Sequence, residues 1–178
     1  MVEVNLNAGP LNTTPASAPS TKADDFSTSQ LHDLIPFVSH DRAFAVFTDQ
    51  VEGMAENKPC APLPHAPVAV VGVVCLHGRM LTVLDPAALL APERPRWPGN
   101  LPHVIALRGD EQFALAAEIC SDTITVSAED IEPASEQKLP DGLVVGLVRH
   151  GGAEILVLDT NRLVSLAVDR KERRRRRF

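Results

Sequence analysis

The pattern of apolar and polar positions is clearest over residues 63–90, where it predicts a β-hairpin. Two short apolar runs, residues 71–76 and 80–84, are typical of strands that are apolar on both faces. His77 and Gly78 stand between the runs. A two-residue hairpin loop favours positive φ angles, which glycine adopts freely and histidine tolerates better than an aliphatic residue does. The sequence therefore predicts a tight turn at these two residues.

A helix signal follows the second strand. Asp85 can accept hydrogen bonds from the free N–H groups of a starting helix, so it is expected to be an N-cap. Pro86 fits the first helical position, because its missing N–H has no partner there in any case. Residues 87–90 are expected to turn helical.

The same unit recurs 74 residues downstream. Residues 72–78 align with residues 146–152, so that a glycine before the turn and a glycine within it keep their spacing. The Val-Leu-Asp run that ends at Asp85 aligns with the run that ends at Asp159. Two copies of strand, glycine turn, strand and aspartate-capped helix predict two similar subdomains packed together.

Further short strands are expected around turn signals elsewhere in the chain. They are residues 35–39 and 43–47 around a polar turn, 104–108 and 112–118 around Gly-Asp-Glu, and 123–126 before a helical turn capped by Ser127 with Asp130. Short strands with a turn signal about every 8 to 12 residues predict an all-β fold. Two linked copies favour a pair of small barrels.

Composition limits the classes of function. The chain has 178 residues, 44% of them hydrophobic, which is enough for one domain or two intimately packed small ones. It has six Phe, one Trp and no Tyr, so a surface that stacks on single-stranded nucleic acid is disfavoured. Residues 170–178 hold seven basic residues and one acid, which leaves 10 basic and 22 acidic residues in the rest of the chain. An acidic body repels phosphate backbones, so no nucleic-acid partner is expected.

The chain is expected to have three parts. Residues 1–30, which are rich in Ser, Thr, Asn, Ala and Pro, are expected to be a disordered tail, residues 31–169 the folded domain, and residues 170–178 a basic tail. The three cysteines share no metal or disulfide spacing and indicate free thiols in a reducing compartment. No apolar run approaches the roughly 18 residues of a membrane span, so a cytoplasmic protein without direct membrane insertion is expected.

Candidate catalytic and metal-binding residues are few. Cys75 and His77 point to the same side of one strand and His65 precedes them, so a metal pair or a Cys/His dyad can be considered. We expect neither, because Cys75 lies in an apolar run, where a buried thiol acts as a small hydrophobe. Asp85 and Asp159 are explained as helix caps without catalysis. No catalytic residue, metal site or cofactor is therefore predicted.

Trp97 lies in a proline-rich loop over residues 91–102. An interface tryptophan often dominates binding, so Trp97 could anchor a partner. We expect instead that it covers the edge of a barrel, because a lone indole in a loop usually packs on its own fold.

These motifs also carry a family resemblance. The run P-x-A-P, then G-V-x-x-L-x-G-R, then V-L-D within residues 63–85 resembles the central motif of CheW-like domains, the adaptors of bacterial chemotaxis arrays. Residues 146–164 are similar to the closing motif of that family. Residues 44–46 and 51–54 resemble its first strand and the segment after it. The resemblance spans roughly residues 34–170 and leaves both tails out.

The resemblance implies a fold of two five-stranded, SH3-like barrels packed together with short capping helices. It implies a non-enzymatic scaffold that couples methyl-accepting chemoreceptors to a receptor-coupled, CheA-like sensor histidine kinase. The contacts would be made by exposed barrel edges and by the apolar groove between the barrels. The partner-binding positions that the resemblance implies are Val51, Met54, His77, Gly78 and Arg79.

The chain departs from the family pattern at two of these positions. The functional arginine of the family's L-R-G turn is His77 here, with Arg79 two residues later, and the family's glutamate before Met54 is Gly53. Arginine is charged at any pH, whereas histidine gains its charge only as the pH falls. If the partner presents a carboxylate to His77, the affinity is expected to rise from pH about 7.5 to about 6.

Two alternative functions follow from the same residues. One is an adaptor of a divergent chemosensory system that controls pili or a second messenger. The other is a small-barrel nucleic-acid module that uses the arginine-rich tail, whose binding would fall steeply with salt.

Overall fold

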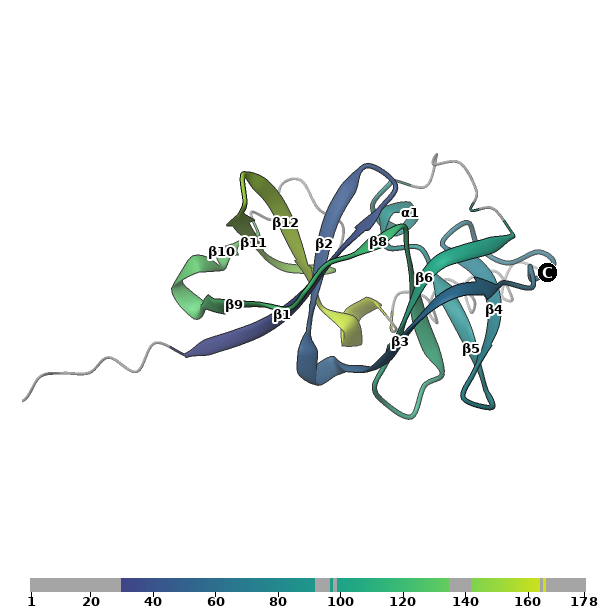
Figure 1. Ribbon diagram of the computed structural model, residues 1–178. Coiled ribbons are helices and arrows are strands. Elements are labelled where there is room, and N and C mark those ends of the chain that lie inside the picture. The colour runs from purple at the N-terminus through teal and green to yellow at the C-terminus, as the bar shows by residue number, and fades with distance from the viewer. Residues whose placement is uncertain (1–29, 92–96, 98, 135–141, 164, 166–178) are drawn as a thin grey trace, which may run out of the picture.

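The computed structural model describes residues 30–91, 97, 99–134, 142–163 and 165 (Figure 1). These residues form two β-sheets with a few short helical turns. The expected tails, residues 1–30 and 170–178, lie outside the described residues apart from Gln30. Their disorder stays a prediction.

One sheet has seven strands in the order β10-β11-β12-β2-β1-β8, with β9 also paired to β1. Its strands are β1 (Leu31–Ser39), β2 (Arg42–Phe47), β8 (Ile119–Cys120), β9 (Ile124–Ser127), β10 (Glu132–Pro133), β11 (Val144–His150) and β12 (Ala153–Leu158). The other sheet has five strands in the order β3-β6-β7-β5-β4. Its strands are β3 (Val51–Pro59), β4 (Val70–Leu76), β5 (Arg79–Leu84), β6 (Asn100–Leu107) and β7 (Phe113–Ala117). The helical elements are α1 (Pro86–Leu90) and the 3₁₀ turns η1 (Thr48–Gln50) and η2 (Ala128–Asp130).

The predicted internal repeat is confirmed. The bounds of β4 and β5 fall on those of β11 and β12 with the same shift of 74 residues, and the two hairpins lie on opposite sides of the molecule (Figure 1). Each hairpin has a register shift at its start, between Val70 and Gly72 and between Val144 and Gly146. The second strand of each hairpin then pairs in parallel with a strand from another part of the chain, β5 with β7 and β12 with β2.

The local turn and cap predictions are also confirmed. His77 and Gly78 have φ angles of 50° and 77°, as a tight hairpin turn favours. Asp85 caps α1 with Pro86 at its start. Asp159 accepts a hydrogen bond from the N–H of Arg162 at 3.0 Å, at the start of a helical turn over residues 160–163. The Ser127 and Asp130 capping box is present around η2.

A shared core joins the two sheets. Its main cluster takes buried side chains from both sheets and from the capped helical turns, including Ile35, Phe37, Phe44, Leu84, Leu89, Ile105, Leu115, Leu143, Leu158 and Leu163. Each sheet also has a smaller cluster of its own. Phe37 and Phe44 stack with ring centroids 5.7 Å apart. Aliphatic residues supply most of this core, as the scarcity of aromatic residues requires.

The predicted fold class, an all-β pair of small packed units with short capping helices, is confirmed. The five-stranded sheet has the predicted number of strands. The other sheet has seven, because β1 pairs with two separate short strands and β10 adds two residues at the far edge.

The expectation that Cys75 is buried is wrong. Along β4 the side chains at Gly72, Val74 and Leu76 are buried, whereas Cys75 is exposed. The apolar run suggested a strand that is buried on both faces. Because side chains alternate across a strand, and only one face of β4 meets the core, Cys75 projects outward.

Candidate partner-binding surface

The predicted partner-binding residues lie where β3 approaches the tip of the β4–β5 hairpin. In the pairing of β3 with β6, Val51 lies opposite Leu107 and Gly53 lies opposite Ala106, so Glu52 is an extra residue in a β-bulge. A bulge redirects the side chain of the strand that contains it. Both carboxylate oxygens of Glu52 accept hydrogen bonds from Nη1 of Arg79, each at 2.7 Å.

The structure brings four of the five predicted residues to the surface. Met54 is 50% exposed on β3, and His77 and Gly78 are exposed in the hairpin turn. The Arg79 side chain is 38% exposed. Val51 is buried, with 8% of its surface exposed, and its side chain belongs to the shared core. Val51 therefore supports this surface from below.

A small hollow lies between β3 and the hairpin tip. It has a volume of about 20 Å³ and is lined by Glu52, Gly53, Leu76, His77, Arg79, Leu81 and Ala106. The buried side chains of Leu76 and Leu81 contribute apolar walls, and Glu52 and Arg79 contribute charges. A Cβ atom at Gly53 would meet no other atom within 4 Å, so the space beside this position is open. The hollow could accept a group about the size of a methyl.

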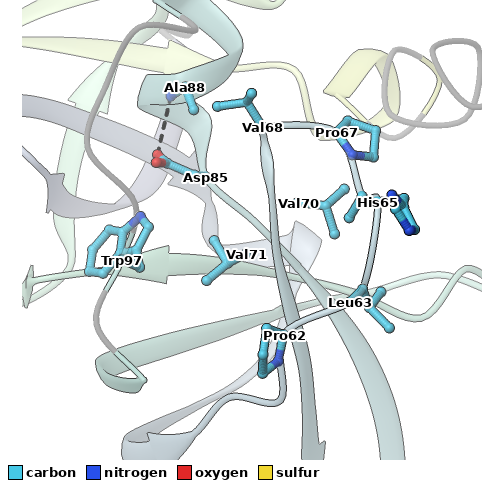
Figure 2. Close-up of a pocket in the computed structure, with 11 residues that line it drawn as sticks. Pro62, Leu63, His65, Pro67, Val68, Val70, Val71, Asp85, Ala88 and Trp97 are labelled. Atoms are coloured by element: carbon cyan, nitrogen blue, oxygen red, sulfur yellow. Dashed lines mark hydrogen bonds between the residues drawn. The ribbon is translucent and has the colours of Figure 1, made fainter.

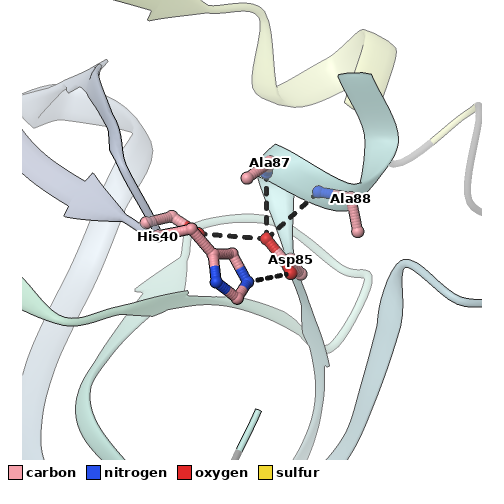
Figure 3. Close-up of polar contacts among 5 residues, drawn as sticks. His40, Asp85, Ala87 and Ala88 are labelled. Atoms are coloured by element: carbon pink, nitrogen blue, oxygen red, sulfur yellow. Dashed lines mark hydrogen bonds and ion pairs between the residues drawn. The ribbon is translucent and has the colours of Figure 1, made fainter. Parts of the chain in front are cut away.

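Asp85 forms a second polar centre, away from this surface (Figure 3). Its carboxylate accepts hydrogen bonds from Oγ of Ser39 at 3.0 Å and from Nε2 of His40 at 2.9 Å. It also accepts from the backbone N–H groups of Ala87 at 2.9 Å and Ala88 at 3.2 Å. The N-cap of α1 thus also ties the β1–β2 turn of one sheet to the helix that follows β5 of the other.

This serine, histidine and aspartate do not form a catalytic triad. In such a triad the histidine lies between the serine and the aspartate and takes the proton of the serine. Here Ser39 and His40 both bind the carboxylate of Asp85, which is 2% exposed. The arrangement is that of a structural junction.

A cleft of about 270 Å³ lies beside this junction (Figure 2). Its walls are the loop over residues 62–68, Val70 and Val71 of β4, Asp85 and Ala88 at the start of α1, and Trp97. Trp97 is half-buried against the cluster of the five-stranded sheet, as expected for a residue that covers its own fold. Its ring centroid lies 5.0 Å from that of His40.

The cysteines show two environments. Burial raises the pKa of the Cys60 thiol. Burial, helped by the nearby charge of Glu56, raises the pKa of Cys120 to about 11. Both thiols therefore stay protonated at neutral pH, whereas metal ligation and nucleophilic attack require the thiolate. Among the described residues, no group of three or more His, Cys, Asp or Glu could hold a metal ion.

Two contacts of these sites were not foreseen in the sequence. Glu52 was not singled out, because the bulge that turns it toward Arg79 depends on the register between β3 and β6. The ties of Ser39 and His40 to Asp85 join segments 46 and 45 residues apart. Only the capping role of Asp85 had a local signal.

Comparison with known proteins decides the family. Residues 33–168 match the family model of the CheW-like domain. The chain belongs to the CheW-like family. It is 30% identical over 116 residues to "Chemotaxis protein CheW" of Rhizobium meliloti (strain 1021), which covers 65% of this chain and 75% of that protein. It is 29% identical over 104 residues to "Probable chemotaxis protein CheW" of Rhizobium etli, which covers 58% of this chain and 67% of that protein.

A solved structure shows the same fold. The crystal structure of scaffolding protein TtCheW from Thermoanaerobacter tengcongensis matches with a TM-score of 0.62 at 14% identity, over 73% of this chain and 90% of that chain. As a CheW-family member, the chain is a non-enzymatic scaffold that couples chemoreceptors to the CheA kinase in chemotaxis signalling. The family resemblance of the sequence is confirmed, and the nucleic-acid alternative is set aside. Among the residues that the structure describes, no helix is long and apolar enough to span a membrane.

Proposed function

We propose that the chain binds the C-terminal regulatory domain of a receptor-coupled, CheA-like histidine kinase through one defined surface. This hairpin surface consists of Glu52, Gly53, Met54, His77, Gly78 and Arg79. The observation that carries the proposal is an exposed methionine beside a charged pair at the tip of a hairpin. Methionine and arginine are enriched at protein interfaces relative to the rest of the surface.

The other partners are proposed to be methyl-accepting chemoreceptors. Binding both would let the chain hold kinase and receptor together without chemistry of its own. We place this activity in the cytoplasm. The three cysteines, Cys60, Cys75 and Cys120, are free thiols, which fits a reducing compartment.

Titration calorimetry with the regulatory domain of the kinase encoded beside this protein tests the proposal. The full chain is expected to bind, and a chain without residues 1–25 is expected to bind equally well, because the hairpin surface lies in the folded domain. Met54→Glu should weaken binding at least about tenfold, since it places a charge where an apolar contact is made. Val68→Glu is the matched control, because Val68 is 48% exposed and lies outside the hairpin surface.

Three results bear on the proposal in different ways. Absence of binding by the full chain would reject the kinase as a partner. Equal weakening by Met54→Glu and Val68→Glu would reject the hairpin surface as the binding site. Loss of binding on removal of residues 1–25 would assign the contact to that segment instead.

A further inference from the structure

Arg79 has hydrogen-bonding capacity beyond its ion pair. Both oxygens of Glu52 contact the same nitrogen, Nη1, at 2.7 Å. Nε and Nη2 of Arg79 make no hydrogen bond to any residue that the structure describes. An arginine side chain binds a carboxylate best through two parallel N–H groups, and the edge formed by Nε and Nη2 offers such a pair.

The contact between Glu52 and Arg79 adds little to stability. Their side chains are 47% and 38% exposed, and exposed ion pairs typically contribute little because water and salt screen them. The β-bulge nevertheless fixes Glu52 opposite Arg79, and Gly53 leaves the adjacent space open. These features hold the guanidinium in one orientation while leaving it accessible.

We propose that Arg79, oriented by Glu52, recognises a carboxylate on the kinase through its Nε and Nη2 atoms. This inference rests on the proposed function and names the chemistry of its contact. Glu52 acts as a positioning residue, because it touches Arg79 and not the partner. The charged or titratable groups that line the hollow are Glu52, His77 and Arg79. Of the two that can be cationic, only Arg79 has a carboxylate that holds it in place.

His77 has a different part in this surface. Its φ angle of 50° lies in the left-handed region, where asparagine and glycine are tolerated and most residues are strained. His77 therefore shapes the turn that precedes Arg79. With Arg79 as the cation, the affinity does not rise between pH 7.5 and 6.

A charge swap separates recognition from a structural contact. Arg79→Glu is expected to weaken kinase binding at least about tenfold in calorimetry. The double variant Glu52→Arg with Arg79→Glu restores an ion pair and is expected to keep the wild-type unfolding midpoint, yet to bind as weakly as Arg79→Glu. A kinase domain in which the contacting carboxylate is replaced by lysine, found by reversing its exposed acids one at a time, should restore binding to the double variant.

Binding of the double variant at wild-type affinity would show that the pair only links β3 to the hairpin, and would overturn the inference. A second arm compares wild type and His77→Asn at pH 7.5 and pH 6. Equal affinities are expected throughout, whereas tighter binding at pH 6 that disappears in His77→Asn would assign the contact to His77. If the wild-type chain does not bind the kinase at all, the proposed function fails. If it binds but the variants change nothing, only this inference fails.

Discussion

Asp85→Ala is expected to lower the free energy of unfolding by about 3–5 kcal/mol, the cost of removing one partner from a buried charged network. The carboxylate is 2% exposed and accepts hydrogen bonds from Ser39, His40 and two backbone N–H groups at the start of α1. Removing it leaves these buried or partly buried donors without their acceptor, and each unsatisfied buried donor adds to the cost. The loss thus combines a missing helix cap with a broken tie between the sheets.

Asp159→Ala is the control that the internal repeat supplies. Asp159 occupies the equivalent position and caps its helical turn through the N–H of Arg162. Its loss is expected to cost only about 0.5–2 kcal/mol, the usual range for an N-cap. Urea denaturation of both variants measures the difference. Equal losses would mean that the contacts of Ser39 and His40 with Asp85 contribute nothing.

Gly72→Ala is expected to lower the free energy of unfolding by about 1–3 kcal/mol or more, the usual cost of overpacking. A Cβ atom at this position would lie 2.3 Å from the carbonyl oxygen of Ala61 and 2.7 Å from Sγ of Cys60. Ala61 also exchanges backbone hydrogen bonds with Val73, so its backbone cannot withdraw without breaking them. The chain needs glycine here because two backbone segments pass too close for a side chain.

Gly146→Ala should cost a similar amount, since its Cβ would lie 2.6 Å from Cγ2 of Ile131 and 2.7 Å from the carbonyl oxygen of Glu132. Gly53→Ala is the matched control in a strand, because its Cβ would meet nothing within 4 Å. That variant should be neutral or slightly more stable. Thermal or urea unfolding of the three proteins tests this. A Gly72→Ala protein as stable as Gly53→Ala would contradict the close approach of the two backbones.

The predictable part of the fold is the part with local causes. The turn at His77 and Gly78, the Asp85 cap and the capping box of Ser127 depend on residues within a few positions of one another. The internal repeat carried this local knowledge across the chain, because a match at a constant shift of 74 residues implies the same unit twice. Two similar subdomains followed from it before any pairing between distant strands was known.

The part that was not predictable depends on how distant segments meet. Glu52 and Arg79 are separated by 27 residues, and they face each other only because a bulge changes the register of β3. Cys75 was misplaced because an apolar run does not tell whether one face of a strand or both are covered. The partner-binding positions came from the family resemblance. Among them, the structure shows that Val51 supports the surface from the core.

The most direct test of the scaffold function is sedimentation of three components. Membranes that carry the chemoreceptor encoded near this protein are mixed with the kinase, with and without the full chain, and centrifuged. The account predicts that the kinase sediments with the membranes only when the chain is present, and that Arg79→Glu largely abolishes this while the chain itself still sediments. Kinase that sediments equally well without the chain, or that stays in the supernatant with it, would contradict a scaffold that joins the two.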